Sequence, residues 1–119
     1  RLLAIAEAVT ETIAEWKPYA LAIERLFLHT NQKTVMPVAE ARGAILVSAA
    51  RAELPVYEYT PLQIKIAVTG YGRSDKRQVT EMVKRLIALP PKKRLDDEYD
   101  AIAVGLMHLA SANKVPICK

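Results

Sequence analysis

Residues 19–28 read YALAIERLFL, and this nearly uninterrupted apolar stretch decides the fold class. It follows Pro18, which ends a pattern over residues 1–17 in which apolar side chains recur at helical spacing. A short apolar segment directly after a helix is typical of a strand that is buried in a parallel or mixed sheet. The sequence therefore predicts an amphipathic helix followed by a buried strand.

Helical and strand patterns continue to alternate along the chain. Thr60 followed by Pro61 is a helix N-cap with proline at the first helical position, and Ser74 is the expected N-cap of a later helix. We expect a helix over 34–53, a strand over 55–59, and helices over 61–68, over 75–88 and from Asp96 or Asp97 onward. This order predicts an α/β fold, a mixed sheet flanked by helices.

The predicted sheet is incomplete, because two strands are too few to cover this many helices. The chain also begins with Arg1, inside the first helical pattern, and has no initiating Met. Its 119 residues, 51% of them apolar, fit one domain. We therefore expect residues 1–119 to form a single domain that lacks its opening strands.

Composition excludes several classes of protein. Uncharged apolar runs stay well below the roughly 18 residues that a membrane-spanning helix needs, so no membrane partner is expected. Cys118 is the only cysteine, which excludes a disulfide within the chain and a zinc site built on cysteines. No signal peptide opens the sequence, and a cytoplasmic location is the expectation.

Charge is concentrated in one segment. Residues 65–94 carry nine basic and two acidic side chains, and residues 95–119 carry two basic and four acidic ones. Such a basic stretch fits a polyanionic partner, and it equally fits a solvated helix face with its linker. The apolar side chains of 34–53 cover more than one stripe, so this helix lies deep in the core or also packs against a second subunit.

Two acidic features are candidates for chemistry. Glu24 interrupts the apolar strand, where an ionised carboxylate is costly unless it lies at the wet end, pairs with Arg25 or another base, or binds a metal. Asp97 and Asp100 are three residues apart and so share a helix face, where a divalent cation such as Mg²⁺ or Mn²⁺ would relieve their repulsion. Acidic first turns of helices are also common without any metal.

Basic and aromatic residues supply further candidates. Lys65 and Lys76 flank the loop 69–73, whose glycines allow backbone to approach a phosphate that these lysines and Arg73 would neutralise. The loop is also consistent with a plain turn between helices. Phe27, near the expected strand end, could stack on an unpaired base or belong to the core.

Several of these blocks together resemble the RuvC-type Holliday junction resolvases of bacteria. The similarity is collinear over nearly the whole chain. The matching residues are 22–27 (AIERLF), Asn31 and 41–43 (ARG), then 55–59 (PVYEY), 63–65 (QIK), 70–72 (GYG) and Lys76, and finally Asp97, 100–103 (DAIA) and His108.

The resemblance implies a ribonuclease-H-like fold and an active site in which a carboxylate cluster holds two Mg²⁺ ions, with Mn²⁺ as a plausible substitute. Glu24, Asp97 and Asp100 match three of the four acidic ligands of the family. Lys65 and Lys76 match its DNA-contacting lysines, and Phe27 matches an aromatic residue near the junction.

The sequence departs from the family at two places. The first acidic ligand of the family lies on an opening strand, in a Gly-Ile-Asp-Pro-Gly context that would precede Arg1, so this chain alone is expected to be inactive. Ala39-Glu40 stands where the family more usually has Gly-Gln.

The leading hypothesis is a metal-dependent endodeoxyribonuclease that resolves four-way junctions in DNA recombination and repair. The implied partners are junction DNA, a second copy of the chain in a homodimer, and a branch-migration helicase complex. Two alternatives stay open: a non-catalytic DNA-binding fragment, and a related ribonuclease-H-like nuclease with another nucleic-acid substrate.

Overall fold

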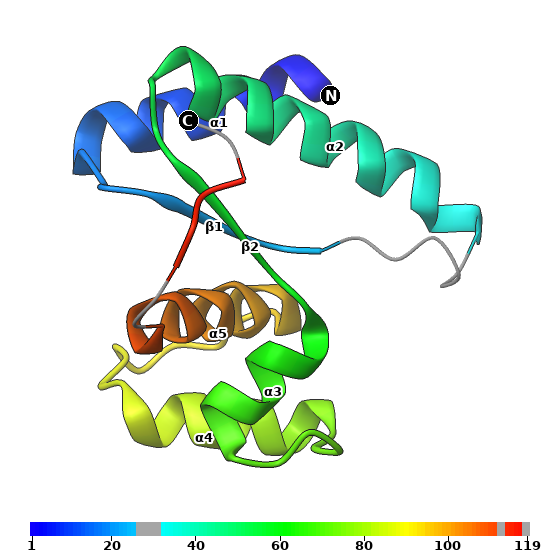
Figure 1. The fold of residues 1–119 in the computed structure, drawn as a ribbon, viewed down its shortest axis with the longest axis vertical. Helices are drawn as coiled ribbons and strands as arrows, with labels where there is room; N and C mark the ends of the chain where they lie inside the picture. The colour runs from blue at the N-terminus through cyan, green and yellow to red at the C-terminus, as the bar shows by residue number, and fades with distance from the viewer. Residues whose placement is uncertain (26–31, 112–113, 118–119) are drawn as a thin grey trace. The chain divides into compact units, whose positions relative to one another are not determined.

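The computed structural model describes residues 1–25, 32–111 and 114–117. Within these ranges, helices and strands alternate in the expected α/β order (Figure 1). The elements are α1 (Leu2–Trp16), β1 (Leu21–Glu24), α2 (Gln32–Arg51), β2 (Val56–Tyr59), α3 (Pro61–Thr69), α4 (Lys76–Leu86) and α5 (Asp96–Ala110). In the described part of the chain, no helix has the length and apolar character needed to cross a membrane.

The two strands form a parallel pair. The N–H of Leu21 donates to the carbonyl of Pro55 at 2.9 Å, and the N–H of Arg25 donates to the carbonyl of Tyr59 at 2.8 Å. Donors and acceptors thus advance together along both chains, which is the parallel register. The strand expected over 19–28 begins at Leu21, and its expected continuation from residue 26 lies outside the described residues.

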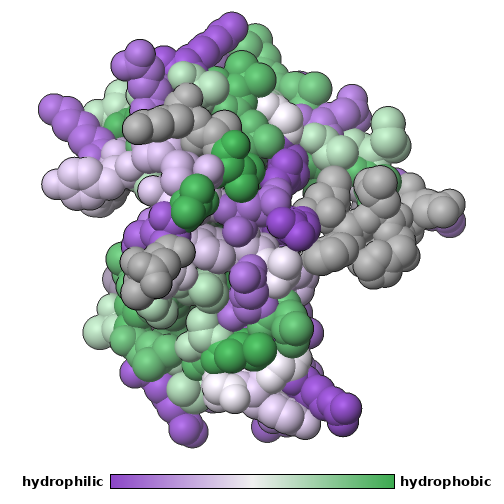
Figure 2. All heavy atoms as spheres, viewed as in Figure 1, coloured by the Kyte–Doolittle hydropathy of each residue, from purple (hydrophilic) through white to green (hydrophobic). Residues whose placement is uncertain are grey.

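The chain forms two compact units. The first contains α1, α2 and the beginnings of both strands, and the second contains the ends of both strands together with α3, α4 and α5. Apolar side chains reach the visible surface in both units (Figure 2). The expectation of a single domain stays a prediction.

Helix α1 packs along α2 in the first unit. The Ser48 hydroxyl, on the buried side of α2, donates to the carbonyl of Ala44 at 2.9 Å, and Ala49 beside it is fully buried. The opposite side of α2 leaves Met36 and Val47 exposed. Packing of the helix against α1 therefore explains one of its apolar stripes, and the other is exposed among the described residues of this unit.

Local capping sets the start of α3 and α4 in the second unit. Thr60 caps α3 as expected: its hydroxyl accepts from the Gln63 N–H at 3.1 Å. The expected cap of α4, Ser74, is wrong, because Asp75 fills that place and accepts from the Gln78 N–H at 2.8 Å. The Ser74 hydroxyl is buried and bonds instead to the preceding turn, donating to the carbonyl of Tyr71 at 2.6 Å.

Helices α3, α4 and α5 pack against one another and supply the core of the second unit. Helix α5 begins at Asp96 as expected, but no side chain caps it, since its N-cap position is Leu95. The three acidic side chains of its first turn, Asp96, Asp97 and Glu98, instead complement the helix dipole. The buried side chains of this unit are Tyr59, Ile64, Val68, Ser74, Val79, Val83, Tyr99, Ala103 and Val104.

Candidate functional site

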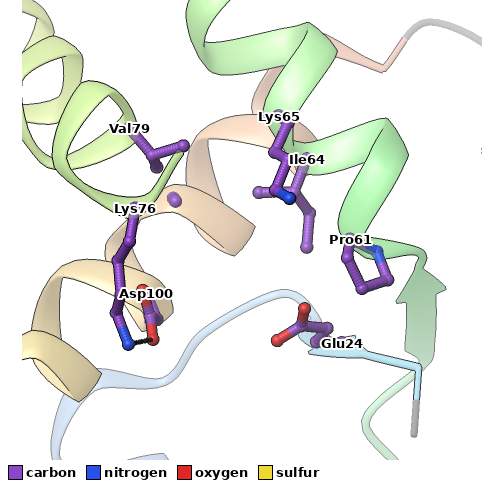
Figure 3. A pocket seen from close by; sticks show the side chains of 8 residues that line it. Glu24, Pro61, Ile64, Lys65, Lys76, Val79 and Asp100 are labelled. Carbon is purple, nitrogen blue, oxygen red and sulfur yellow. Dashed lines mark ion pairs between the residues drawn. The ribbon is translucent and has the colours of Figure 1, made fainter. Parts of the chain in front are cut away.

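A pocket of about 300 Å³ in the second unit brings together side chains from four elements (Figure 3). Its polar members are Glu24 at the end of β1, Lys65 on α3, Lys76 at the start of α4 and Asp100 on α5. Its apolar members are Pro61, Ile64, Val79 and Ala103. Two carboxylates and two ammonium groups that are far apart in sequence therefore share one concave site.

Glu24 occupies the last position of β1, and its side chain points into the pocket (Figure 3). Successive strand residues point to opposite faces, so Arg25 is directed elsewhere. The Arg25 Nε atom lies 3.0 Å from Oε1 of Glu58, with which it forms an ion pair. Arg25 therefore neutralises Glu58 and leaves Glu24 available to the pocket, which removes the alternative that Glu24 pairs with its neighbour.

The surroundings of Glu24 disfavour its ionised form. Desolvation by the atoms packed around the carboxyl group raises its pKa, and the negative charge of Asp100 raises this pKa further. The positive charges of Lys65 and Lys76 act in the opposite direction but are the smaller influences. Glu24 keeps solvent access, yet desolvation and the charge of Asp100 together raise its pKa by more than the two lysines lower it.

Lys76 is held by Asp100. Its Nζ atom lies 3.1 Å from Oδ2 of Asp100, and this hydrogen bond together with the charge of Asp100 raises the pKa of Lys76. Lys76 is the first residue of α4, where a helix dipole disfavours a cation. The ion pair to α5 offsets that cost, and both side chains stay substantially exposed to solvent.

The remaining predicted site residues lie elsewhere. Asp97 is exposed in the first turn of α5 and does not line the pocket, although its charge contributes to the raised pKa of Lys76. Arg73 is exposed in the loop between α3 and α4 and also lies away from the pocket lining. Phe27 lies outside the described residues. The structure thus brings together Glu24, Asp100, Lys65 and Lys76.

The carboxylate oxygens of the pocket are the type of donor atom that a hard divalent cation prefers. Glu24 and Asp100 offer carboxylate oxygens, which Mg²⁺ and Mn²⁺ prefer, and after desolvation the charge of Asp100 is the second cause that raises the pKa of Glu24. Among residues 1–25, 32–111 and 114–117, no three acidic, histidine or cysteine side chains gather into a ligand group. Two protein ligands are compatible with Mg²⁺, which keeps several waters and takes oxygens from substrate phosphates.

Sequence patterns alone did not identify two parts of this site. Its apolar lining, for example Val79 and Ala103, has the same helical periodicity as any core residue. A hydrogen bond between Tyr59 and His108 joins β2 to α5 outside the pocket lining, and only the fold brings these positions together. The single signal for it was the position of His108 on the same helix as Asp100.

Comparison with known proteins identifies the family of the chain. A family model described as crossover junction endodeoxyribonuclease RuvC matches residues 1–108. The chain belongs to this family. A RuvC of Desulfitobacterium hafniense is 45% identical over 113 residues, which are 95% of this chain and 68% of that protein. A RuvC of Syntrophomonas wolfei is 48% identical over 111 residues, which are 93% of this chain and 64% of that protein.

Solved structures give the same family. The structure of Thermus thermophilus RuvC matches with a TM-score of 0.81 and 34% identity, over 91% of this chain and 65% of that one. The same protein in complex with a Holliday junction substrate matches with a TM-score of 0.83 and 34% identity, over 91% of this chain and 66% of that one. The chain therefore spans about two thirds of the length of its RuvC relatives, and the expected family and ribonuclease-H-like α/β fold are confirmed.

Proposed function

We propose that the full-length protein is an endodeoxyribonuclease that cleaves four-way DNA junctions by hydrolysis of a phosphodiester. Membership of the RuvC family and similarity to a structure with a Holliday junction substrate support this proposal. The observation that carries it is the pocket in which Glu24 and Asp100 lie with Lys65 and Lys76. Carboxylates supply ligands for a hard cation, and lysines supply positive charge for a phosphate.

Glu24 and Asp100 would hold Mg²⁺, and Asp97, one turn earlier on α5 and outside the pocket lining, keeps its predicted role as a further oxygen donor. Two ions in each active site and substitution by Mn²⁺ belong to the same proposal. When bound, the cation lowers the pKa of a coordinated water and stabilises charge on phosphoryl oxygens. The carboxylates must be ionised to act as ligands, so the raised pKa of Glu24, caused first by desolvation and then by the charge of Asp100, makes cation binding at this site weaker as pH falls.

The basic residues bind and orient the DNA backbone in this proposal. Lys65 and Lys76 approach the pocket from different helices, so they can contact phosphates on two sides of a cleaved bond. Arg73, exposed in the loop before α4, extends the positive surface beyond the pocket. Phe27, three residues after Glu24, keeps its predicted role of stacking on an unpaired base.

The assembly and location are also proposals. A four-way junction has two-fold symmetry, which a homodimer matches, and the exposed Met36 and Val47 on α2 provide apolar surface for a second copy. A branch-migration helicase complex remains the expected further partner. Because the proposed substrate is cellular DNA, the cytoplasm is the proposed site of action.

The test is cleavage of a labelled four-way junction by the full-length protein with Mg²⁺. We expect cleavage by the wild type and a loss of at least about a hundred-fold for Glu24→Gln and Asp100→Asn, because each removes a charged ligand. Glu81→Gln is the matched control, since Glu81 is an exposed carboxylate of α4 outside this pocket. Wild-type rates for Glu24→Gln would contradict the site assignment.

Cleavage rates on other nucleic acids test the specificity for four-way junctions. Linear duplex and an RNA–DNA hybrid of the same sequence should be cut far more slowly than the junction. Equal rates on the duplex or the hybrid would indicate a ribonuclease-H-like nuclease with another substrate. Tight junction binding by the wild type without any cleavage would indicate a DNA-binding protein without nuclease activity.

A further inference from the structure

A hydrogen bond between two aromatic side chains connects β2 to α5 away from the pocket. The hydroxyl of Tyr59 lies 2.6 Å from Nδ1 of His108, and the two rings are 5.8 Å apart at 62°, an edge-to-face arrangement. Tyr59 is only 6% exposed, and His108 is partly buried. A buried phenol needs a hydrogen-bond partner for its hydroxyl. The Tyr59–His108 hydrogen bond therefore fixes the position of β2 relative to α5 more closely than apolar packing alone would.

Tyr59 is tied to the elements that carry Glu24 and Lys65. Its carbonyl accepts the N–H of Arg25, the residue immediately after Glu24, at 2.8 Å. The next residue in the chain is Thr60, whose capping box fixes the first turn of α3, the helix of Lys65. A shift of Tyr59 would therefore move the end of β1 and the start of α3 together.

His108 is tied to Asp100 through α5. The two residues lie eight positions apart on one uninterrupted helix, which is about 12 Å along its axis. The carbonyl of His108 also accepts from Nζ of Lys114 at 3.0 Å, which anchors the last turn of the helix. Because a helix of this length moves as a rigid element, the position of His108 determines the position of Asp100.

We propose that Tyr59 and His108 are positioning residues, whose hydrogen bond sets the separation of the Glu24 and Asp100 carboxylates and so the affinity of the pocket for Mg²⁺. This inference rests on the proposed nuclease function, because it assigns those carboxylates to a cation. The two residues act at a distance, since neither lines the pocket. The connection runs from Asp100 along α5 to His108, across the hydrogen bond to Tyr59, and through the Arg25 amide to Glu24.

A neutral His108 side chain can keep its hydrogen bond with Tyr59 in either tautomer. Burial lowers the pKa of its imidazole, and the charge of Lys114 lowers this pKa further, so the ring is neutral at pH 7. In one tautomer the Tyr59 hydroxyl donates to Nδ1, and in the other Nδ1–H donates to the phenol oxygen. Either arrangement holds the same two atoms together.

The test compares variants of the full-length protein that keep or remove a hydrogen-bonding group at this one place. Tyr59→Phe keeps the ring and removes the hydroxyl. His108→Asn places an amide group near the position of Nδ1, whereas His108→Gln places it near that of Nε2. Tyr19→Phe is the matched control, because Tyr19 is a tyrosine outside the proposed site with its side chain almost fully in solvent.

We expect Tyr59→Phe and His108→Gln to weaken Mg²⁺ binding by about five-fold, as measured by calorimetry without DNA. Both variants should also lower kcat for junction cleavage at fixed Mg²⁺ by a similar factor. Junction affinity in EDTA should stay within two-fold, because the lysines are retained. His108→Asn should bind Mg²⁺ more tightly than His108→Gln, and Tyr19→Phe should match the wild type.

Unchanged Mg²⁺ affinity in Tyr59→Phe and His108→Gln would overturn the proposal, as would equal affinities for His108→Asn and His108→Gln. A purely structural role would lower the melting temperature and reduce Mg²⁺ and junction affinity together, which also contradicts it. The proposed function fails separately, when the wild type does not cut junctions. In that case the calorimetric comparison still decides whether this hydrogen bond controls the pocket.

Discussion

Lys76 Nζ lies 3.1 Å from Asp100 Oδ2, so a proposed phosphate-binding group and a proposed cation ligand neutralise each other in the absence of DNA and metal. A cation that takes the Asp100 carboxylate must displace this ammonium group. The displaced Lys76 is then available to a DNA phosphate. Cation binding and DNA binding at this pocket are thereby linked through one side chain, and such a linkage is reciprocal.

The first prediction is that Lys76→Gln strengthens Mg²⁺ binding while it weakens junction binding. Removal of the ammonium group frees Asp100 and removes a repulsive positive charge, so Mg²⁺ affinity should rise by up to about five-fold, the upper range for an exposed ion pair. Calorimetry without DNA measures this change. Arg77→Gln is the control with the same change in charge on the next residue, outside this pocket, and should leave Mg²⁺ affinity nearly unchanged. Weaker Mg²⁺ binding by Lys76→Gln would show that the two cations do not compete.

The second prediction concerns the pH dependence of stability at Glu24. Its pKa is raised in the folded protein from an ordinary value of 4.5, chiefly by desolvation and then by the charge of Asp100. The folded state therefore binds this proton more tightly than the unfolded state does, so its stabilising effect is present below 4.5 and lost as pH rises through the folded pKa. Glu24→Gln should leave the melting temperature unchanged at about pH 4 and raise it near pH 7.5, both measured in EDTA.

The control for this experiment is Glu81→Gln, which neutralises an exposed carboxylate on α4 away from the pocket. It should produce no comparable gain at pH 7.5. Addition of Mg²⁺ should then stabilise the wild type but not Glu24→Gln, because the cation relieves the repulsion that the substitution had already removed. A melting temperature of Glu24→Gln below that of the wild type at pH 7.5 would contradict this reading of the pocket.

The third prediction is that Lys65→Gln lowers the salt dependence of junction binding. A lysine that neutralises one DNA phosphate releases about one counterion, so the slope of log affinity against log salt should become shallower by about 0.9. Binding titrations at several salt concentrations in EDTA measure the slope. Arg51→Gln, an equal change in charge at the end of α2, should keep the wild-type slope. An unchanged slope for Lys65→Gln would remove Lys65 from the phosphate contacts.

Much of this architecture followed from local patterns in the sequence. Pro18, the apolar run after it and the Thr60–Pro61 start signal each specify a local conformation, and the helices and strands lie where those signals place them. The sequence predicted only a parallel or mixed sheet, and the backbone hydrogen bonds of the structure show that these two strands are parallel. Such patterns could not tell which of Asp97 and Asp100 lines the pocket, because both are acidic residues at the start of one helix. Only the packing of α5 against α3 and α4 brings Asp100 to the lining and leaves Asp97 exposed.

The start of α4 shows a second limit of local patterns. Ser74 and Asp75 are adjacent, and both are good N-cap residues. The choice between them depends on the preceding turn, where the Ser74 hydroxyl is buried and donates to the carbonyl of Tyr71. With Ser74 engaged there, Asp75 takes the cap and Lys76 becomes the first helical residue.

The fourth prediction is that Asp75→Ala destabilises the protein by about 1 kcal/mol, the usual cost of losing an N-cap side chain. Asp75 Oδ1 accepts the Gln78 N–H at 2.8 Å, and the Gln78 side chain returns a bond to the Asp75 N–H at 2.8 Å, so the substitution breaks a reciprocal capping box. Chemical denaturation measures the loss, and Asp75→Asn is the control that keeps an accepting oxygen. Fraying of this turn would also release Lys76, so Asp75→Ala should weaken junction binding more than Asp75→Asn does. Equal stability of the two variants would show that the cap does not hold the start of α4.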